Sequence, residues 1–315
     1  MSARVGLLAV LLQISPTVVR SQDTLTLADT LPGWALNLGV YQVGVSLGNS
    51  SRWNGVRINF SDRAVREVNG VNLTLWRPRQ NRFATYRGVS VGLAPHGREL
   101  IGLSVGLAGV IAERATRGMT VAGLGAVSNG DMMGVHLAGL GVVSQGGMYG
   151  LNVAGLGAVS QGDMVGINIA GLGTVAQGRM FGINVSGLGT VAEGSMRGLN
   201  VAGLGVVAIR GVTGIAATLG GIESREFVRG FAVAGYRVKS PRVQGFVVPV
   251  AWLRATQLDG GSISVYNQVG EQHGLVIGVV NYARELHGVQ LGVINIAGNN
   301  RGIARVLPLV NLHLK

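Results

Sequence analysis

A sixteen-residue unit that repeats without a gap decides the fold of this chain. Its clearest copies are GLNVAGLGAVSQGDMV at 150–165, GINIAGLGTVAQGRMF at 166–181 and GINVSGLGTVAEGSMR at 182–197. Each copy opens on a glycine, and glycines keep the sixteen-residue spacing from Gly102 to Gly230. Self-similarity at a fixed period is the signature of a repeat architecture.

Looser copies extend the array in both directions. Upstream copies open at Gly55, Gly70 and Gly88, and downstream copies open at Gly245, Gly261, Gly274, Gly288 and Gly302. The sequence therefore predicts four segments, namely a signal peptide at 1–21, an N-terminal cap region at 22–54, a Gly-rich repeat array at 55–301, and a C-terminal cap or last strand at 302–315.

Within one unit the residues predict two short strands and two bends. The segment LNVA at 151–154 alternates apolar with small or polar residues, which is the period of a strand. A glycine every few residues disfavours a helix, at about 1 kcal/mol each relative to alanine. The runs at 155–157 and 161–163 carry turn chemistry, so we expect a tight corner at Gly155.

Such a unit fits two all-β architectures. In a β-solenoid each unit is one coil, equivalent residues stack about 4.8 Å apart, and the array contains about sixteen coils of 14–16 residues. In an outer-membrane β-barrel, each unit is instead about one strand with a tight turn.

A one-residue deletion distinguishes the two architectures. Most units have the glycine spacing of 198–203, whereas 274–278 and 288–292 are one residue shorter. In a continuous barrel strand, that deletion moves every later side chain to the opposite face. It does no harm where the second glycine is a corner between two separate segments. We therefore expect a β-solenoid, and the barrel, which implies a pore-like protein, is the alternative.

The N-terminus has the pattern of a secretory signal peptide. Met1 to Arg4 carry one positive side chain, and the apolar run 5–14 follows. Small or permissive residues precede Gln22, so we expect cleavage after Ser21. The apolar run is too short to cross about 30 Å of hydrocarbon as a helix. The sequence thus predicts an exported protein.

Three stretches of the array resemble a known family. GINVSGL at 182–188, GLVIGVVNYA at 274–283 and GVQLGVINIAG at 288–298 are similar to the repeats of the bacterial surface-repeat protein family described from spirochaetes. The resemblance covers about 55–314. It implies an exported surface or outer-membrane location, and it carries no catalytic residue and no established biochemical activity.

Composition and motifs argue against an enzyme. The chain has no cysteine, which excludes disulfides, a thiol nucleophile, a zinc ribbon and an iron–sulfur site. Its Gly-x-Gly elements lack the Lys-Ser/Thr pair of a phosphate-binding loop. No Ser, His and Asp set occupies one repeat position. We expect no catalytic residue, no cofactor and no small-molecule substrate.

One column of asparagines predicts a structural ladder. In stacked coils, each side-chain amide bonds the equivalent amides of the coils above and below. The column contains Asn152, Asn168, Asn184 and Asn200.

Two acid–histidine pairs recur fourteen residues apart. In stacked coils Glu271, His273, Glu285 and His287 converge within reach of one metal ion. The competing interpretation is a solvated turn with ordinary polar residues. The other histidines of the array, His96 and His136, are isolated, and we expect them to be surface or hydrogen-bonded side chains.

The net charge of +12 comes almost wholly from arginine. A basic surface with the aromatic residues Trp53, Trp76 and Tyr86 nearby favours binding of a polyanion, such as the lipopolysaccharide of an outer membrane. Export makes intracellular nucleic acid an unsuitable partner. The main interpretation remains a solvated surface on a structural or adhesive protein. The arginines concerned are Arg52, Arg57, Arg63, Arg66, Arg77, Arg79, Arg82 and Arg87.

Overall fold

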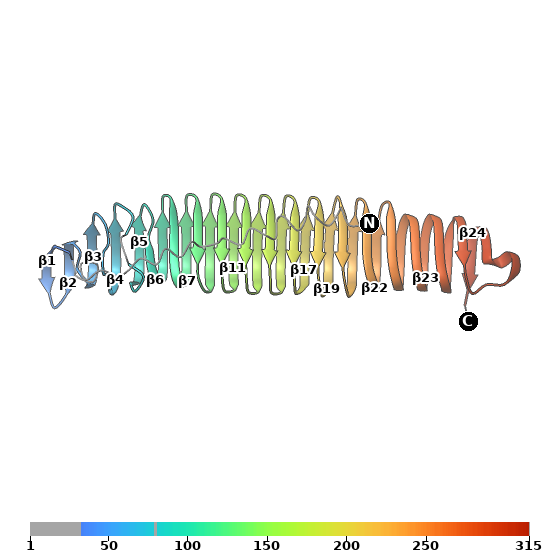
Figure 1. Cartoon of the computed structure of the whole chain (residues 1–315), viewed down its shortest axis with the longest axis horizontal. Coiled ribbons are helices and arrows are strands. Elements are labelled where there is room, and N and C mark those ends of the chain that lie inside the picture. Colours follow the sequence, from blue (N-terminus) through green and yellow to red (C-terminus); the bar gives the residue numbers. More distant parts are fainter. Residues whose placement is uncertain (1–32, 79–80, 315) are drawn as a thin grey trace, which may run out of the picture. The chain divides into compact units, whose positions relative to one another are not determined.

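The computed structural model describes residues 33–78 and 81–314, which form a β-solenoid of about 13 turns. The chain winds into coils that stack in a row (Figure 1). Neighbouring coils are joined by parallel strand pairing with a sixteen-residue register, such as Asn152 with Asn168. The fold is therefore the expected solenoid, and the barrel alternative is wrong. The predicted signal peptide, 1–21, lies outside the described residues.

Each complete coil contributes one long strand and one short strand. The long strands pair in parallel into what we name the long-strand sheet. Alternation of apolar and small residues gives these strands a buried and an outward side. Its separate members are β2 (Val43–Gly48), β3 (Arg52–Asn59), β4 (Glu67–Thr74), β5 (Thr85–Gly92), β9 (Met132–Ala138), β11 (Met148–Ala154), β13 (Met164–Ala170), β15 (Met180–Ser186), β17 (Ser195–Ala202), β19 (Gly211–Thr218) and β21 (Phe227–Ala234).

The short strands pair in the same way into the short-strand sheet, which lies opposite. Its separate members are β8 (Gly125–Ser128), β10 (Gly141–Ser144), β12 (Gly157–Ser160), β14 (Gly173–Ala176), β16 (Gly189–Ala192), β18 (Gly205–Ala208) and β20 (Gly221–Ser224). Four strands continue around a corner, and these are β6 (His96–Gly106), β7 (Gly109–Ala122), β22 (Arg237–Pro249) and β23 (Trp252–Ala297). No helix among residues 33–78 and 81–314 is both long and apolar enough to cross a membrane.

The first coils are incomplete, and this explains why there are about 13 turns rather than the expected sixteen or so. Strands β3, β4 and β5 pair with one another in the long-strand sheet. Their counterparts in the other sheet are absent from the described residues before His96, which pairs with Ile111. The glycine period therefore counts early coils whose described residues form only the long strand.

An antiparallel strand lies at each end of the stack. β1 (Ala35–Val40) pairs antiparallel with β2. β24 (Val306–His313) pairs antiparallel with the last coil of β23 and follows a short 3₁₀ helix, η1 (Gly302–Arg305). These strands fall in the segments 22–54 and 302–315 that the sequence assigns to caps, although 22–32 lie outside the described residues. Gly302 begins η1, so the expected coil at that glycine is wrong.

A column of glycines with positive φ defines the start of every coil. Gly166 has φ +118°, and a Cβ atom there would lie 2.1 Å from the Gly150 carbonyl oxygen. Glycine adopts this conformation at no steric cost. The column member after Gly245 is Gly260, with φ +134°, rather than the expected Gly261. The coil there has fifteen residues, because the register pairs Gly245 with Gly260.

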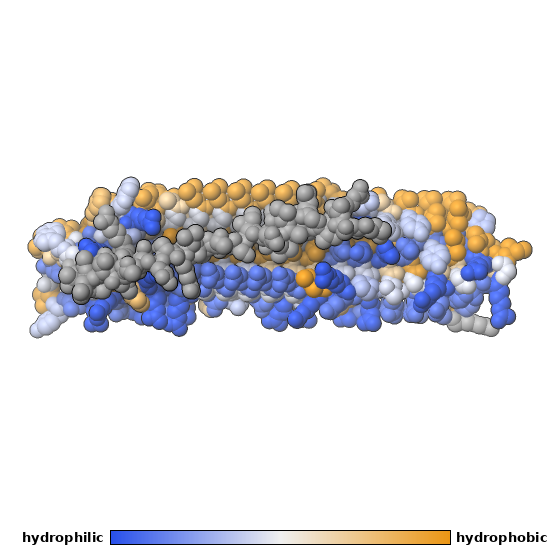
Figure 2. Space-filling view, viewed as in Figure 1, coloured by the Kyte–Doolittle hydropathy of each residue, from blue (hydrophilic) through white to orange (hydrophobic). Residues whose placement is uncertain are grey.

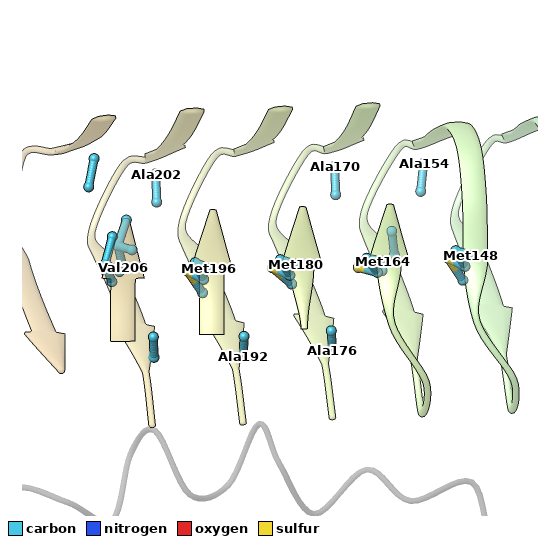
Figure 3. Close-up of a cluster of buried hydrophobic side chains, with 14 of the residues drawn as sticks. Met148, Ala154, Met164, Ala170, Ala176, Met180, Ala192, Met196, Ala202 and Val206 are labelled. Atoms are coloured by element: carbon cyan, nitrogen blue, oxygen red, sulfur yellow. The ribbon is translucent and has the colours of Figure 1, made fainter. Parts of the chain in front are cut away.

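The core is a narrow layer between the two sheets. Over five successive coils a column of methionines fills it, with small alanines on either side (Figure 3). The column continues after Met196 as Val212, Val228 and Val243. The five methionines are 0–1% exposed. They are Met132, Met148, Met164, Met180 and Met196.

A second interior column is polar over most of its length. The four asparagines of the predicted ladder belong to this column. The column becomes apolar at Ala216, which pairs with Asn200. Its members are at most 3% exposed, so each buried polar group needs a hydrogen-bond partner or costs free energy. In chain order they are Ser46, Arg57, Asn72, Ser90, Ser104, Thr120, His136, Asn152, Asn168, Asn184 and Asn200.

Candidate functional site

The outward side of the long-strand sheet is an apolar surface. Ile167 and Ile169 flank the buried Asn168 on the strand, and both are 39% exposed. Two such outward side chains recur in each coil, because alternate residues of a strand point to opposite faces. The two rows run from the pair Val56 and Ile58 to the pair 289 and 291, and only Gly261 breaks the apolar pattern.

A third apolar row lies on the corner between the two sheets. Leu156, which follows the corner glycine Gly155, is 47% exposed. Apolar residues form a band along one edge of the stack, and hydrophilic residues gather along the opposite edge (Figure 2). Exposed apolar patches of this kind mark interaction surfaces. The corner row comprises Leu107, Leu124, Leu140, Leu156, Leu172, Leu188, Leu204, Leu219, Val250, Val265, Val279 and Val293.

The predicted asparagine ladder is confirmed. The Nδ2 atom of Asn152 donates to Oδ1 of Asn168 at 2.9 Å, and the next two steps, to Asn184 and Asn200, have the same length. All four side chains are fully buried. The ladder therefore stabilises the interior, and its atoms are not available to a ligand.

A second amide ladder lies in the C-terminal coils. Asn267 donates to Asn281 at 2.8 Å, and Asn281 donates to Asn295 at 2.7 Å. The fourteen-residue spacing of these asparagines is visible in the sequence. The glycine spacing of these units is one residue shorter, so their alignment with the asparagines of the central units is not evident from the sequence. This ladder is also buried and therefore structural.

His136 occupies the interior column directly before the first ladder. It is fully buried between Thr120 and Asn152, and neither of its ring nitrogens has a hydrogen-bond partner among the described residues. Burial lowers the pKa of His136 from 6.5 to about 4. The expectation of a surface or hydrogen-bonded histidine is therefore wrong here. It holds for His96, whose Nε2 lies 2.9 Å from Glu113 Oε1.

Arg57 is buried in the interior, so its assignment to a polyanion-binding surface is wrong. Its guanidinium donates to Asp62 at 2.6 Å and to Asn72 at 2.7 Å. The Tyr86 hydroxyl donates to Asp62 at 2.7 Å. Burial alone raises the pKa of Asp62, but Arg57 and donors that include Tyr86 and Thr74 outweigh it and hold that pKa below its ordinary value. Burial and the Asp62 charge raise the pKa of Tyr86.

The other predicted arginines lie in different surroundings. Arg52, Arg66, Arg77, Arg82 and Arg87 are exposed and Arg63 is half-buried, whereas Arg79 lies outside the described residues. Arg87 forms an ion pair with Glu67, and Arg82 lies 3.9 Å from Glu113.

The aromatic residues near these arginines divide into two groups. Trp53 and Tyr86 are buried, whereas Trp76 is exposed and its ring stacks on Phe60 with centroids 6.5 Å apart. The expected aromatic contribution to a basic surface is therefore confined to this exposed pair.

The metal candidates come together without forming a metal centre. The rings of His273 and His287 stack with centroids 4.9 Å apart, one coil above the other. Glu271 and Glu285 both approach Arg284, at 3.7 and 3.6 Å. Among residues 33–78 and 81–314, no group of three or more acidic and histidine side chains is placed to hold a metal ion.

Three serines stand in Gly-x-Ser-x-Gly stretches, the sequence pattern of a hydrolase nucleophile elbow. Such an elbow presents its serine at a sharp strand-to-helix turn. Ser46, Ser90 and Ser104 instead lie within strands, and each points into the polar interior column with at most 3% exposure. These serines are part of the packing of the solenoid.

Comparison of the chain with family models, with curated proteins and with solved structures finds no match.

Proposed function

We propose that this chain is an exported, non-enzymatic solenoid with a structural role at a bacterial cell surface, and that its long-strand sheet packs against a second copy of the chain. The observation that carries this proposal is the pair of apolar rows along the outward side of that sheet. The signal-peptide pattern at 1–21 and the resemblance to spirochaete-type surface repeats support the cellular location.

The size of the apolar face suits a stable dimer. About 13 turns at a spacing of about 4.8 Å make it about 60 Å long. Its width, from the first outward row to the corner row, is five residues or about 17 Å. The product is on the order of 1,000 Å², against about 800 Å² per partner in a standard interface. It exceeds the 300–600 Å² or so of a typical largest surface patch.

The chemistry of the face also favours a second copy. Its two outward rows contain no charged side chain from Val56 to Leu291, so packing desolvates no ion there. Rows of side chains repeat with the same coil spacing on both copies. The ridges of one copy therefore match the grooves of the other, as in the packing of two sheets about 10 Å apart.

Sedimentation velocity of the secreted chain, in buffer without detergent and over a wide range of protein concentration, tests this proposal. We expect a reversible dimer, and a mass spectrum in which the mature chain begins at Gln22. A species that remains monomeric at every concentration would overturn the association. Binding to phospholipid vesicles by a monomer would instead identify the face as a lipid-binding surface.

A second candidate function is the binding of a polyanion outside the cell. Arg52, Arg66 and Arg77 are exposed and form no ion pair within the described residues, and the stacked Phe60 and Trp76 lie on the same coils. Titration with dextran sulfate at increasing salt tests this function. Electrostatic binding by these arginines weakens steeply as salt rises, whereas a purely structural surface gives no binding.

A further inference from the structure

The C-terminal coils depart from the repeat at one surface position. The outward row of the short-strand sheet is apolar in seven successive coils, from Ile111 to Val207. In the next coil Val207 pairs with Glu223, and the row continues as Lys239 and Arg254. A local departure from an otherwise regular pattern is the kind of place where a functional site is expected.

These side chains line an open groove with a volume of about 670 Å³. Its lining includes four cationic side chains, those of Arg225, Lys239, Arg254 and Arg284, and a single carboxylate, that of Glu223. The same groove is lined by Thr256, Gln268 and the exposed ring of Tyr282. It thus combines positive charge with neutral hydrogen-bonding groups and one aromatic surface.

Two of the four cations are available to a ligand. Lys239 pairs with Glu223 at 2.8 Å, and Arg284 lies near Glu271 and Glu285. Arg225 and Arg254 are exposed, and their side chains form no ion pair or hydrogen bond within the described residues. An arginine fork matches the geometry of a carboxylate, phosphate or sulfate group.

We propose that this groove binds an acidic polysaccharide. Arg225 and Arg254 bind the acidic groups of the polymer, Thr256 and Gln268 bond its hydroxyl groups, and Tyr282 packs against a sugar ring. The lining residues come from successive coils about 4.8 Å apart, which suits an extended chain laid across them. This inference rests on the polyanion-binding candidate function, but it places the ligand at the C-terminal coils instead of the N-terminal arginines.

The composition of the groove favours a polysaccharide over a single-stranded nucleic acid. Proteins that bind single strands stack successive bases on several aromatic side chains. The described lining of this groove contains one aromatic residue, Tyr282, beside hydroxyl and amide groups. One ring suits one sugar, and it provides no platform for a run of bases.

Binding of the full secreted chain to polygalacturonate and dextran sulfate, measured by isothermal titration calorimetry, tests the proposal. Neutral dextran and oligothymidylate are the comparison ligands. We expect the double variant Arg225→Gln, Arg254→Gln to weaken binding of the acidic polysaccharides by at least about tenfold. The matched control, Arg117→Gln with Arg197→Gln, removes two exposed arginines elsewhere that form no ion pair within the described residues, and it is expected to change the affinity by less than about twofold.

The outcomes distinguish a failure of polyanion binding itself from a failure of its assignment to this groove. If the unaltered chain binds no acidic polysaccharide, the candidate function fails and the groove assignment fails with it. If the control pair loses binding and the groove pair retains it, polyanion binding stands but the groove assignment is overturned. Oligothymidylate bound as tightly as the polysaccharides would overturn the ligand class. Tyr282→Leu is expected to weaken polysaccharide binding at every salt concentration, because it removes an uncharged contact.

Discussion

His136 occupies the place in the interior column where the asparagine ladder stops. Within the described part of the chain its imidazole has no hydrogen-bond partner, and Oδ1 of Asn152, the next residue in the column, also has none. Each ladder amide donates from Nδ2 to the Oδ1 one coil later. An asparagine in place of His136 would therefore donate to an acceptor that is now unpaired.

His136→Asn is expected to stabilise the fold at pH 7 by about 1 kcal/mol, the usual net value of one hydrogen bond. Urea unfolding measures this change. The control is His96→Asn, at a histidine that bonds Glu113 outside the polar column. A loss of stability in the first variant would show that the imidazole packing outweighs the missing hydrogen bond.

The unfolding free energy of the unaltered chain is expected to fall between pH 6.5 and about 4. The folded chain holds the pKa of His136 at about 4, against 6.5 when unfolded. Between these values the unfolded chain binds more protons, so the stability is complete above pH 6.5 and decreases as the pH falls. The shift corresponds to about 3 kcal/mol. His136→Asn should remove this pH dependence, and an unchanged slope would contradict the assignment to His136.

Arg57→Met is expected to destabilise the N-terminal coils by about 3–5 kcal/mol, because it leaves the buried Asp62 carboxylate without its cation. Hydrogen exchange and urea unfolding measure the effect. Asp62→Asn added to this variant should restore part of the loss, since the uncharged amide keeps one acceptor oxygen, which Tyr86 and Thr74 can share as they share Oδ2 of Asp62. Arg52→Met, at an exposed arginine that forms no ion pair with any described residue, is the control and should change stability little.

At the scale of the elements, two different glycines define each coil. The positive-φ glycine lies within the long strand, as Gly150 does in β11, and the corner glycine follows the last strand residue, where the chain turns toward the short-strand sheet. The expected corner at Gly155 is confirmed, because Gly155 lies in the bend between β11 and β12. The corner is tight, since a Cβ atom there would lie 1.9 Å from the Gly139 carbonyl oxygen. The deletion at 274–278 is accommodated for the same reason, since the two segments of each coil set their faces separately.

Gly155→Val is expected to lower the unfolding free energy by about 2–4 kcal/mol, because the backbone of the neighbouring coil must move away from the new side chain. The matched control is Gly157→Ala, two residues later, where an added Cβ would lie 3.7 Å from its nearest atom. The control should change stability by less than about 0.5 kcal/mol. Equal effects in the two variants would remove the distinction between corner and strand glycines.

At the scale of the whole molecule, stacking converts a weak local pattern into an extended surface. Two outward apolar residues in one strand are unremarkable, because much of any protein surface is apolar. The same two residues repeated in register over about 13 turns form a continuous face. Association through that face depends on the sum of many small contacts, and a single charge placed within it must be desolvated.

Ile183→Glu is expected to weaken the dimer by at least about tenfold, because packing of the long-strand sheet would bury its carboxylate. Sedimentation velocity over a concentration series measures the change. Val159→Glu is the control, since Val159 has nearly the same exposure, 38% against 39%, but lies on the short-strand sheet. Dissociation by the control and not by Ile183→Glu would place the interface on the other sheet.

Sequence periodicity was a reliable guide to columns and a poor guide to which columns face solvent. The asparagine column was predictable because its spacing is constant from Asn152 to Asn200. Arg57 looked like its exposed neighbours, since nothing in its local sequence reveals that Asp62 folds back to meet it in the interior. His273 and His287 were correctly placed on adjacent coils, but their stacking and the Arg284 contacts of the two glutamates depend on side-chain directions.

The amino-acid sequence by itself determined the all-β repeat, its glycine period and the stacking of equivalent residues, because each of these follows from local backbone preferences repeated many times. Only the tertiary structure decided which polar side chains are buried, that the described residues of the early coils form one strand per coil, and that the charged row from Glu223 to Arg254 lines a groove. These features depend on contacts between coils. The residues that make them are far apart in the chain, and no local pattern specifies them.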